Sequence, residues 1–368
     1  MLRHAYGMEF DQWQSWVRDA GFPVWRGGQI FSALQRRRPG AWSELTELPR
    51  SIRGRLEAAF SLAWPAPARR HVSRDGTVRY LLDFSGGTAR TPEKNQAEAV
   101  YLPDEVFDDA GRALRQRATF CISSQIGCAV NCQFCLTALL GLERSLDAGE
   151  IVAQVQFLLA AHEIRPGDDR VNLVFMGMGE PFLNYDAVLR AVRILCHPRG
   201  AGLAPRRITI STSGIVDKIR RYGDEPVRPR LAVSLNAPND ELRAKLMPLH
   251  RGQGGLAALM AAAREYPLAA RERLTFEYVL LARVNDEIAH ARELAARLAG
   301  LRAKVNLIAW NAGPELGWHA PSSARVTAFQ SELRRRGVAA YIRRPRGQDI
   351  FAACGQLKRH EDAVQTEI

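Results

Sequence analysis

Three closely spaced cysteines, Cys128, Cys132 and Cys135, form a C-x3-C-x2-C run that constrains this chain more than any other feature. Thiolates this close on one tight loop can each bind one iron of a [4Fe–4S] cluster and leave the fourth iron open. An open iron can chelate the amine and carboxylate of S-adenosylmethionine, and an electron passed to its sulfonium releases a 5′-deoxyadenosyl radical. The alternative is a structural zinc site completed by a distant His or Cys, for which the sequence has no C-x2-C or H-x3-H partner.

The composition is that of an ordinary globular protein. The 368 residues are 46% hydrophobic and 24% charged, which leaves room for one large domain and a smaller companion. The first residues contain no apolar signal region, and no stretch approaches 18 uninterrupted apolar residues, so we expect neither secretion nor membrane insertion. Six cysteines in such a chain favour metal or redox chemistry in a reducing compartment. We therefore expect a cytoplasmic protein.

The charge balance favours a polyanionic partner. Lys and Arg number 51 against 39 Asp and Glu, a formal charge of +12. An excess of this size is typical of nucleic-acid binding but does not distinguish RNA from DNA. Arginine-rich proteins also reach such values without binding nucleic acid, so charge alone does not decide the question.

Residues 1–65 are predicted to form a small helical domain. Apolar residues recur at helical spacing from Phe10, and further helices are expected after Gly27 and after Pro49. Arginines gather at 36–38 and at 50, 53 and 55. Such a face can grip a phosphate backbone, which predicts an RNA-binding accessory domain, or it can be simply solvated.

Residues 66–116 are predicted to form a β-hairpin and linker. Strands are expected at 70–73, 77–82 and 97–102, and Arg74-Asp75-Gly76 is a turn sequence between the first two. Glu98 lies among apolar residues of the third strand, where it either has a special role or faces solvent. Residues 104–116 are polar and are expected to be an irregular loop.

Residues 117–368 alternate between strands and helices. A capping box at Asp147 and Glu150 predicts the start of the first helix. The fold class is therefore α/β, a partial (β/α)6 barrel open on one side. Its six strands are expected at 119–123, 171–176, 207–211, 231–235, 274–279 and 304–308, and a further strand is expected at 338–343.

Polar residues follow several of these strands where the strands end. Gly179 and Glu180 follow the second strand, Ser211 ends the third, Ser234 to Asn236 the fourth, and Asn311 lies after the sixth. Carboxyl ends of parallel strands meet at one edge, so these residues and the cysteine loop are expected to form one polar cofactor site.

Two further cysteines stand out. Cys121 lies in the first barrel strand near the predicted site, and Cys354 lies in a polar, glycine-flanked loop that is a poor place for a packing cysteine. Cys196 is expected to be a buried hydrophobic residue.

Taken together, these motifs resemble the radical S-adenosylmethionine RNA adenine methyltransferase family, which includes the RlmN and Cfr types. The resemblance runs in order from about residue 8 to about residue 360. The motifs that carry it are Cys121 to Cys135, Gly177-Met178-Gly179-Glu180-Pro181, Ser211-Thr212-Ser213-Gly214, Ser234 to Asp240, and Ala352 to Leu357.

The resemblance implies a mechanism. Carbon 2 of adenine has no nucleophilic lone pair, so a radical route is needed. By resemblance, Cys354 is methylated by one S-adenosylmethionine, and the radical from a second one takes a hydrogen from that S-methyl group. The resulting carbon radical adds to adenine. The family position that corresponds to Glu98 is the proton acceptor. Cys121 corresponds to the thiol that resolves the adduct through a disulfide with Cys354.

The resemblance also implies ligands and partners. Cofactor contacts are expected from Gly179, Glu180, Ser211, Ser234, Leu235, Asn236 and Asn311, with two S-adenosylmethionines used per turnover. The expected substrate is an adenosine of 23S rRNA at the peptidyl-transferase centre, with the adenosine 3′ of the tRNA anticodon as a second candidate. The expected electron donor is an external protein such as flavodoxin, and the expected state is a monomer.

Two other functions remain open at this point. The first is methylation of carbon 8 of the same rRNA adenosine, as in the Cfr type. The second is a non-catalytic iron–sulfur RNA-binding protein, which would need neither Cys354, Cys121 nor Glu98. The chain also departs from the family pattern at Asn236, Ala309, Ala312, Leu142 and Ser145, and its 104–116 segment is long.

Overall fold

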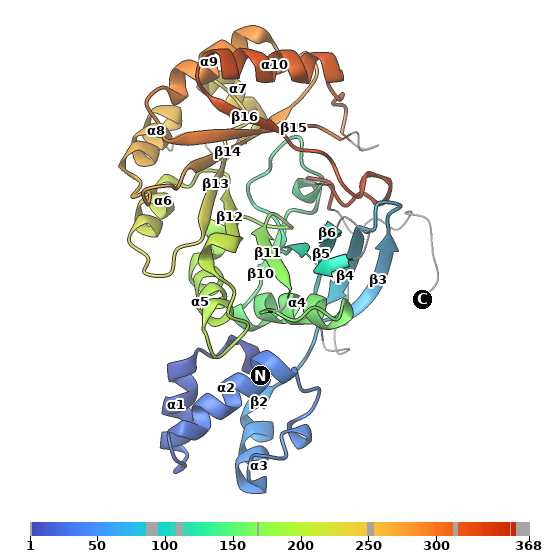
Figure 1. Ribbon diagram of the computed structural model, residues 1–368, viewed down its shortest axis with the longest axis vertical. Helices are drawn as coiled ribbons and strands as arrows, with labels where there is room; N and C mark the ends of the chain where they lie inside the picture. The colour runs from blue at the N-terminus through green and yellow to red at the C-terminus, as the bar shows by residue number, and fades with distance from the viewer. Residues whose placement is uncertain are drawn as a thin grey trace.

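The structure is a computed structural model that describes residues 2–85, 95–104, 117–167, 169–248, 254–311, 316–353 and 355–357, and the backbone of 106–107 and 113–115. Within these residues, a sheet of ten strands runs through the main body in the order β16-β15-β14-β13-β12-β11-β8-β5-β4-β3. Figure 1 shows the sheet surrounded by helices, with the helical N-terminal part set against one end.

Seven neighbouring strands of this sheet are parallel in the described chain, which confirms the α/β partial barrel. Six match the predicted barrel strands. The seventh, β16, was predicted as a strand but not counted in the barrel, and it pairs in parallel with β15 after α10. The strands are β8 (Arg117–Cys121), β11 (Arg170–Phe175), β12 (Ile208–Thr212), β13 (Arg230–Ser234), β14 (Leu274–Leu280), β15 (Ala303–Ala309) and β16 (Ala339–Ile342).

The predicted hairpin region continues the same sheet. Strands β3 (Ala66–Val72), β4 (Val78–Asp83) and β5 (Gln96–Pro103) are antiparallel, and β5 pairs with β8. The turn between β3 and β4 uses Gly76 at a φ of +79°, as its sequence predicts. These strands therefore place Glu98 of β5 next to the first barrel strand.

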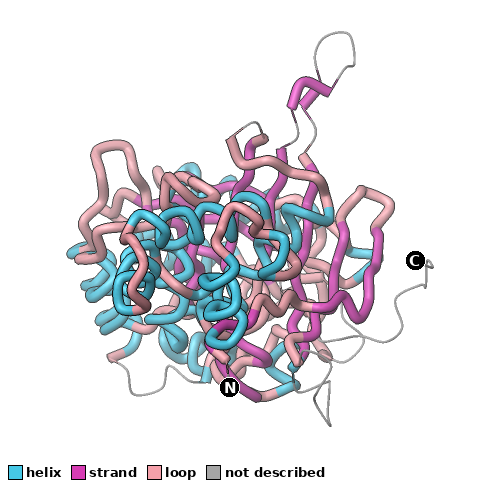
Figure 2. The backbone as a smooth tube through the Cα atoms, turned by 90° about the horizontal axis from the view of Figure 1, so that it is seen from below, coloured by secondary structure: helices cyan, strands magenta, loops and turns pink. Residues whose placement is uncertain are grey.

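The 104–116 segment differs from the expected irregular loop. Its backbone contains a short antiparallel pair, β6 (Val106–Phe107) and β7 (Ala113–Arg115), which projects from the body in Figure 2. Val, Phe and Leu favour strands, and the sequence Asp108-Asp109-Ala110-Gly111 between them has the composition of a turn. The prediction of an irregular loop therefore underestimated the tendency of this segment to form strands.

Helices pack around the parallel strands. The capping box predicted at Asp147 begins α4, where the Asp147 carboxylate accepts from the Glu150 N–H at 2.8 Å. In Figure 1, α6, α8, α9 and α10 cover the far half of the barrel, and α4 and α5 face the N-terminal module. The helices of this part are α4 (Ala148–Ala161), α5 (Tyr185–Cys196), α6 (Val216–Gly223), α7 (Asp240–Leu246), α8 (Gly255–Glu265), α9 (Ile288–Leu298) and α10 (Ser323–Arg335).

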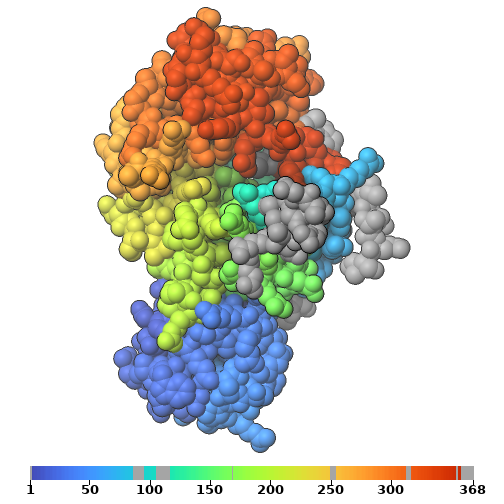
Figure 3. All heavy atoms as spheres, in the orientation of Figure 1, coloured from blue at the N-terminus to red at the C-terminus, as the bar shows by residue number. Residues whose placement is uncertain are grey.

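The N-terminal module has three α-helices in the described chain, as predicted: α1 (Phe10–Asp19), α2 (Trp25–Arg37) and α3 (Arg50–Ala59). A short parallel pair, β1 (Arg3–His4) and β2 (Phe60–Ser61), joins its ends. Its core is aromatic, with fully buried Trp13 against the rings of Trp16, Trp42 and Phe60. Figure 3 shows the module as a distinct lobe beneath α4 and α5.

Some arginines expected on a free face dock this module onto the barrel. The Arg36 guanidinium donates to the carbonyl of Pro198 at 2.9 Å, and Arg38 Nε donates to Gln156 Oε1 at 2.9 Å. Arg37 pairs with Glu47 at 2.6 Å inside the module. These three arginines therefore contribute to the protein's own packing.

No helix in the described part of the chain is long and apolar enough to cross a membrane.

Two glycines of the module test its helix packing. A Cβ on Gly27 of α2 would lie 2.5 Å from the backbone nitrogen of Gln14 in α1, whereas a Cβ on Gly54 of α3 would meet nothing within 4 Å. We expect Gly27→Ala to destabilise the protein by about 1–3 kcal/mol through overpacking. The matched Gly54→Ala should stabilise it by about 0.5–1 kcal/mol. Urea unfolding of both variants measures this, and equal effects would contradict the packing described.

Candidate active site

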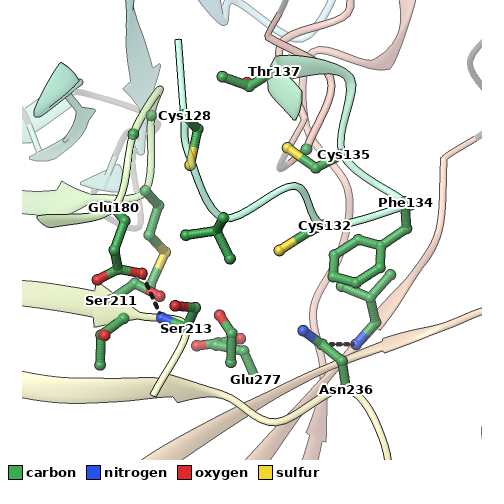
Figure 4. A pocket seen from close by; sticks show the side chains of 18 of the residues that line it. Cys128, Cys132, Phe134, Cys135, Thr137, Glu180, Ser211, Ser213, Asn236 and Glu277 are labelled. Carbon is green, nitrogen blue, oxygen red and sulfur yellow. Dashed lines mark hydrogen bonds between the residues drawn. The ribbon is translucent and has the colours of Figure 1, made fainter. Parts of the chain in front are cut away.

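A pocket lies at the carboxyl ends of the parallel strands. Cys128, Cys132 and Cys135 line one side of it, and residues that end or follow β11, β12 and β13 line the other. Figure 4 shows the three sulfur atoms and the Glu180 carboxylate around this space. The predicted convergence of strand ends and cysteine loop is therefore present.

The cysteine loop is held by its neighbours on several sides. A Cβ on Gly127 would lie 1.9 Å from the carbonyl oxygen of Gly141, so only glycine allows this approach. Two indole N–H groups donate to loop carbonyls, Trp310 to Phe134 at 3.0 Å and Trp318 to Gln133 at 2.7 Å. These bonds fix the direction in which the thiols point.

Backbone contacts also set the position of Glu180. A Cβ on Gly179, whose φ is +99°, would lie 2.6 Å from the Gln125 side chain. The Glu180 carboxylate accepts N–H groups of Phe182 at 2.9 Å and Ser213 at 2.6 Å. The glycines thus allow the close approach that the sequence predicted, and the carboxylate faces the pocket with a fixed orientation (Figure 4).

The pocket concentrates acidic groups away from water. Burial raises the pKa of the Cys128 thiol to about 12, and burial also raises the pKa of Cys132 and Cys135. The Glu180 carboxylate adds to the shift at Cys128 and Cys132. Burial likewise raises the pKa of Glu180 and of Glu277. The charged forms of all five groups therefore need positive charge inside the pocket.

Arg243 of α7 is a buried cation beside this pocket. Its guanidinium donates to the carbonyls of Ser213 at 2.6 Å and Leu235 at 2.6 Å, and so joins the loops after β12 and β13. Burial lowers its pKa to about 10, although the nearby Cys132 acts in the opposite direction. Its bonds go to backbone oxygens, so it braces the loops without neutralising all the acidic groups.

The donor set fits an iron–sulfur cluster better than a single metal ion. Among the described residues, no three His, Cys, Asp or Glu side chains converge on one point that could hold a metal ion. A zinc site needs such convergence, whereas a cluster takes each thiolate on a separate iron. Irons bind thiols in their deprotonated form, and the positive charge of the irons supplies the charge that the pocket lacks. The three cysteines therefore suit a [4Fe–4S] cluster.

Glu98 lies inside the protein. Its side chain and that of Arg79 are each 1% exposed and form an ion pair of 2.5 Å between adjacent strands. The solvent-facing alternative for Glu98 is therefore wrong. The carbonyl of Glu98 also accepts the Ser123 hydroxyl at 2.6 Å, and that hydroxyl accepts the Met178 N–H at 2.9 Å. Glu98 is thus connected to the loop that carries Gly179 and Glu180.

Asn236, which departs from the family pattern, has a local structural reason. It lies at a φ of +58°, a left-handed conformation that Asn tolerates better than most residues. Its Oδ1 accepts the Val279 N–H at 2.9 Å, and its carbonyl accepts from Asn285 at 2.8 Å (Figure 4). The side chain therefore lines the pocket while bonding to β14.

Most predicted site residues meet at this pocket. The predicted residues that line it are Cys128, Cys132, Cys135, Gly179, Glu180, Ser211, Ser234 and Asn236. Leu235, Asn311, Cys121 and Glu98 are outside the lining. Leu235 is fully buried beside it, and Cys121 ends β8. Cys354 and Ala312 lie outside the described residues.

The residues around Cys354 are tied to the site from both sides. The Leu136 N–H donates to the carbonyl of Gly355 at 2.7 Å, and the Thr137 hydroxyl donates to the carbonyl of Leu357 at 2.6 Å. On the other side, the Ser73 hydroxyl at the β3–β4 turn donates to the Asp349 carboxylate at 2.6 Å. Gly355 and Leu357 line the pocket.

Sequence reasoning missed four contributors: Glu277, Arg243, Trp310 as a loop brace, and Trp318. The sequence did contain a signal for Glu277, because a carboxylate within the apolar strand 274–279 must either face solvent or lie in a polar interior. The sequence contains no such signal for Arg243 and the two tryptophans, since their hydrogen-bond partners are backbone atoms that are distant in sequence.

Comparison with known proteins identifies the class first. Residues 122–295 match the Radical SAM superfamily. The structure is also similar to that of a radical SAM methyltransferase from Sphaerobacter thermophilus, with a TM-score of 0.85 and 41% identity over 96% of this chain and 99% of that one. The fold and the cysteine pocket are therefore those of a radical SAM enzyme, whose cofactors are a [4Fe–4S] cluster and S-adenosylmethionine.

Curated relatives define the family more narrowly. The chain is 49% identical over 347 residues to the probable dual-specificity RNA methyltransferase RlmN of Koribacter versatilis, covering 93% of this chain and 97% of the relative. It is 43% identical to the dual-specificity RNA methyltransferase RlmN of Syntrophobacter fumaroxidans, covering 94% of each. The chain belongs to the RlmN family of radical SAM RNA methyltransferases, as its motifs predicted.

The Arg79–Glu98 pair yields a stability prediction. Arg79→Met leaves the Glu98 carboxylate buried without this cation, so we expect a loss of about 3–5 kcal/mol in the free energy of unfolding. Arg220→Met, which removes an exposed pair with Glu265, should cost less than about 1 kcal/mol. Urea unfolding of both variants tests this. Similar small losses would show that the buried pair does not hold Glu98.

Proposed function

We propose that this protein methylates carbon 2 of an adenosine in 23S rRNA, and of a tRNA adenosine as a second substrate. The observation that carries the proposal is the pocket of three thiols and a fixed carboxylate, bordered by the residues that follow Cys354. The relatives named as dual-specificity RNA methyltransferases support RNA as the substrate class. The retained Cys354, Cys121 and Glu98 argue against a purely RNA-binding role.

The cofactor roles are assigned residue by residue. Cys128, Cys132 and Cys135 bind the cluster, which supplies an electron to S-adenosylmethionine and so yields the radical. The Glu180 carboxylate accepts the ammonium of S-adenosylmethionine, because it is buried, oriented by two N–H groups and near two of the thiols. The rest of the molecule is assigned to Ser211, Ser234, Asn236 and Asn311 and to the backbone of Gly179 and Leu235.

The transfer chemistry is assigned to three residues. Cys354 takes a methyl group as a thioether and, after losing one hydrogen from it, forms the carbon–carbon bond to adenine. Glu98 takes the proton that leaves the adenine carbon. The unpaired electron of the adduct would pass to the oxidised cluster. The Cys121 thiolate would then attack the sulfur of Cys354, so that a disulfide forms as the sulfur–carbon bond breaks, and the released carbon would take a proton to become the methyl group of the base. Two S-adenosylmethionines are used, one as methyl source and one as radical source.

The location of Cys121 and Glu98 supports this order. Cys121 ends β8, where it pairs in register with Val100 of β5, two residues from Glu98. The Arg79 guanidinium pairs with the Glu98 carboxylate and so holds in place the group proposed to accept a proton. Both residues thus lie close to the carboxyl end of the first barrel strand, which supports a shared role in processing an adduct on Cys354.

The N-terminal module is proposed to contact RNA. Trp25 is 58% exposed, and the guanidinium of Arg26 lies 4.0 Å from its ring. An exposed indole beside a cation is suited to stacking on a base near a phosphate. The proposed domain organisation is a helical domain at 1–65, a β-hairpin region at 66–116 and the barrel at 117–368. We also propose a cytoplasmic monomer with an external electron donor of the flavodoxin type.

Methylation of carbon 8 is the second candidate. It would use the same residues as those assigned above. The curated relatives are of the RlmN type rather than the Cfr type, which favours carbon 2.

The assignment of Cys121 has a direct test. Cys121→Ala should accumulate protein covalently joined to RNA, because the adduct on Cys354 cannot be resolved. Denaturing gels of reactions with labelled rRNA fragments measure the adduct. The double variant Cys121→Ala/Cys354→Ala is the control and should show no adduct. A clean gel for the single variant, with deoxyadenosine still produced, would contradict resolution by Cys121.

A further inference from the structure

The turn between β3 and β4 is bonded to the chain segment that leads to Cys354, and the mechanism proposed above does not use this contact. The Asp349 carboxylate accepts the Ser73 hydroxyl at 2.6 Å on one oxygen and the Arg74 N–H at 3.1 Å on the other. In Figure 1 the last described part of the chain, in red, lies beside this turn. These bonds therefore join a hairpin turn to the approach to a reactive cysteine.

A second carboxylate makes the same connection in the opposite direction. Asp75 of the turn accepts the Gly347 N–H at 3.0 Å and lies 3.4 Å from Nε of Arg346. Burial acts to raise the pKa of Asp75, but hydrogen bonds from Thr77, Gly347 and Ser73 outweigh it and hold this pKa below its ordinary value. Asp75 is therefore a charged acceptor, which makes stronger hydrogen bonds than a neutral one.

We call this set of contacts the clasp. Its members are Ser73, Arg74 and Asp75 on the turn, and Arg346, Gly347 and Asp349 on the segment before Cys354.

Gly347 allows the two sides of the clasp to lie close together. Its φ is +60°, and a Cβ on it would lie 2.7 Å from the Cβ of Ala352 and 2.9 Å from Cγ2 of Thr77. The carbonyl of Gly347 accepts the Ala352 N–H at 2.9 Å, so the chain folds back on itself here. The position of Asp349 is thus transmitted to Ala353 over a short and tightly folded stretch.

The same hairpin holds the proposed proton acceptor. Arg79 of β4 forms the buried ion pair of 2.5 Å with Glu98. Thr77 lies two residues before Arg79, and its N–H donates to the Asp75 carboxylate at 2.9 Å. The hairpin therefore holds the segment before Cys354 with its turn and Glu98 with its second strand.

The segment after Cys354 is bonded to a different part of the site. The carbonyls of Gly355 and Leu357 accept from Leu136 and Thr137, which follow the last cluster cysteine. Cys354 thus lies between two anchors. The one after it leads to the proposed source of the radical, and the one before it, the clasp, leads to the proposed proton acceptor.

We propose that the clasp positions Cys354 relative to Glu98, so that the carbon radical on Cys354 meets the same adenine carbon from which Glu98 takes the proton. The inference rests on the proposed function, since it requires both of these roles. Reacting atoms must be held about 3–3.5 Å apart, and small misplacements are costly. Ser73 and Asp349 are positioning residues that act through Cys354 rather than on the substrate.

Loss of the clasp uncouples radical formation from methylation. The anchors at Gly355 and Leu357 remain, so the S-methyl group of Cys354 still loses a hydrogen and deoxyadenosine is still formed. A carbon radical that fails to reach adenine takes one electron from the external donor and one proton, and so returns to the S-methyl group. Deoxyadenosine then accumulates without methylated base.

The test compares two product yields of the whole, cluster-loaded protein with an rRNA fragment, S-adenosylmethionine and a reductant. Mass spectrometry measures methyladenosine in the RNA and deoxyadenosine in solution. In Asp349→Ala the ratio of methyladenosine to deoxyadenosine should fall about tenfold or more, while the rate of deoxyadenosine formation stays within about twofold of that of the natural protein.

Further variants identify the contact responsible. Ser73→Ala should lower the ratio in the same direction, and Ser73→Ala/Asp349→Ala should lower it no further than Asp349→Ala, because the two residues share one bond. Asp349→Asn keeps the shape and one acceptor oxygen, and should give an intermediate ratio.

Asp169→Ala is the matched control. The Asp169 carboxylate also accepts a backbone N–H, that of Arg165 at 2.8 Å, but it precedes β11 at the end of the strands opposite the pocket. This variant should keep the natural ratio. Iron content is measured for every variant, and yields are expressed per loaded cluster.

The outcomes separate the two claims. An unchanged ratio in Asp349→Ala and Ser73→Ala overturns the inference, even if both yields fall together, because a purely structural defect lowers them in proportion. Natural, cluster-loaded protein that makes deoxyadenosine but no methyladenosine contradicts the proposed function instead.

Discussion

The burial of acidic groups with too little positive charge is the constraint on which this structure depends. Three thiols and two carboxylates face one pocket, and burial raises the pKa of each. Arg243 is a buried cation beside them, and it donates hydrogen bonds to backbone carbonyl oxygens. Such a pocket is favourable only when cations enter it, and irons and a sulfonium cofactor are cations. The charge of the site therefore favours binding of both the irons and the sulfonium cofactor.

The parallel sheet makes this arrangement possible. Strands β11, β12 and β13 end at the same edge, so their following loops converge without long connections. Glycines at 177 and 179 let the β11 loop lie against residues 122–125, which follow the first barrel strand. Arg243 then ties the next two loops together. The antiparallel strands β3 to β5 extend the same sheet, which brings Glu98 to the first barrel strand.

Much of this was predictable because the chemistry is local in sequence. The cysteine spacing indicated a cluster, and polar motifs after apolar strands indicated where they would meet. Features that depend on register were not predictable: Glu98 is paired with Arg79 on the neighbouring strand, and Glu277 with Asn306. Contacts such as that of Trp310 with the cysteine loop were also missed, because the acceptor is a backbone carbonyl, and every residue has one.

The most direct measurement is mass spectrometry of adenosines from rRNA and tRNA incubated with reconstituted protein, S-adenosylmethionine and a reductant. The account predicts 2-methyladenosine in rRNA, formed together with deoxyadenosine. The appearance of 8-methyladenosine in its place would contradict the assigned position of methylation. Deoxyadenosine without any methylated adenosine in either RNA would contradict the assigned substrates.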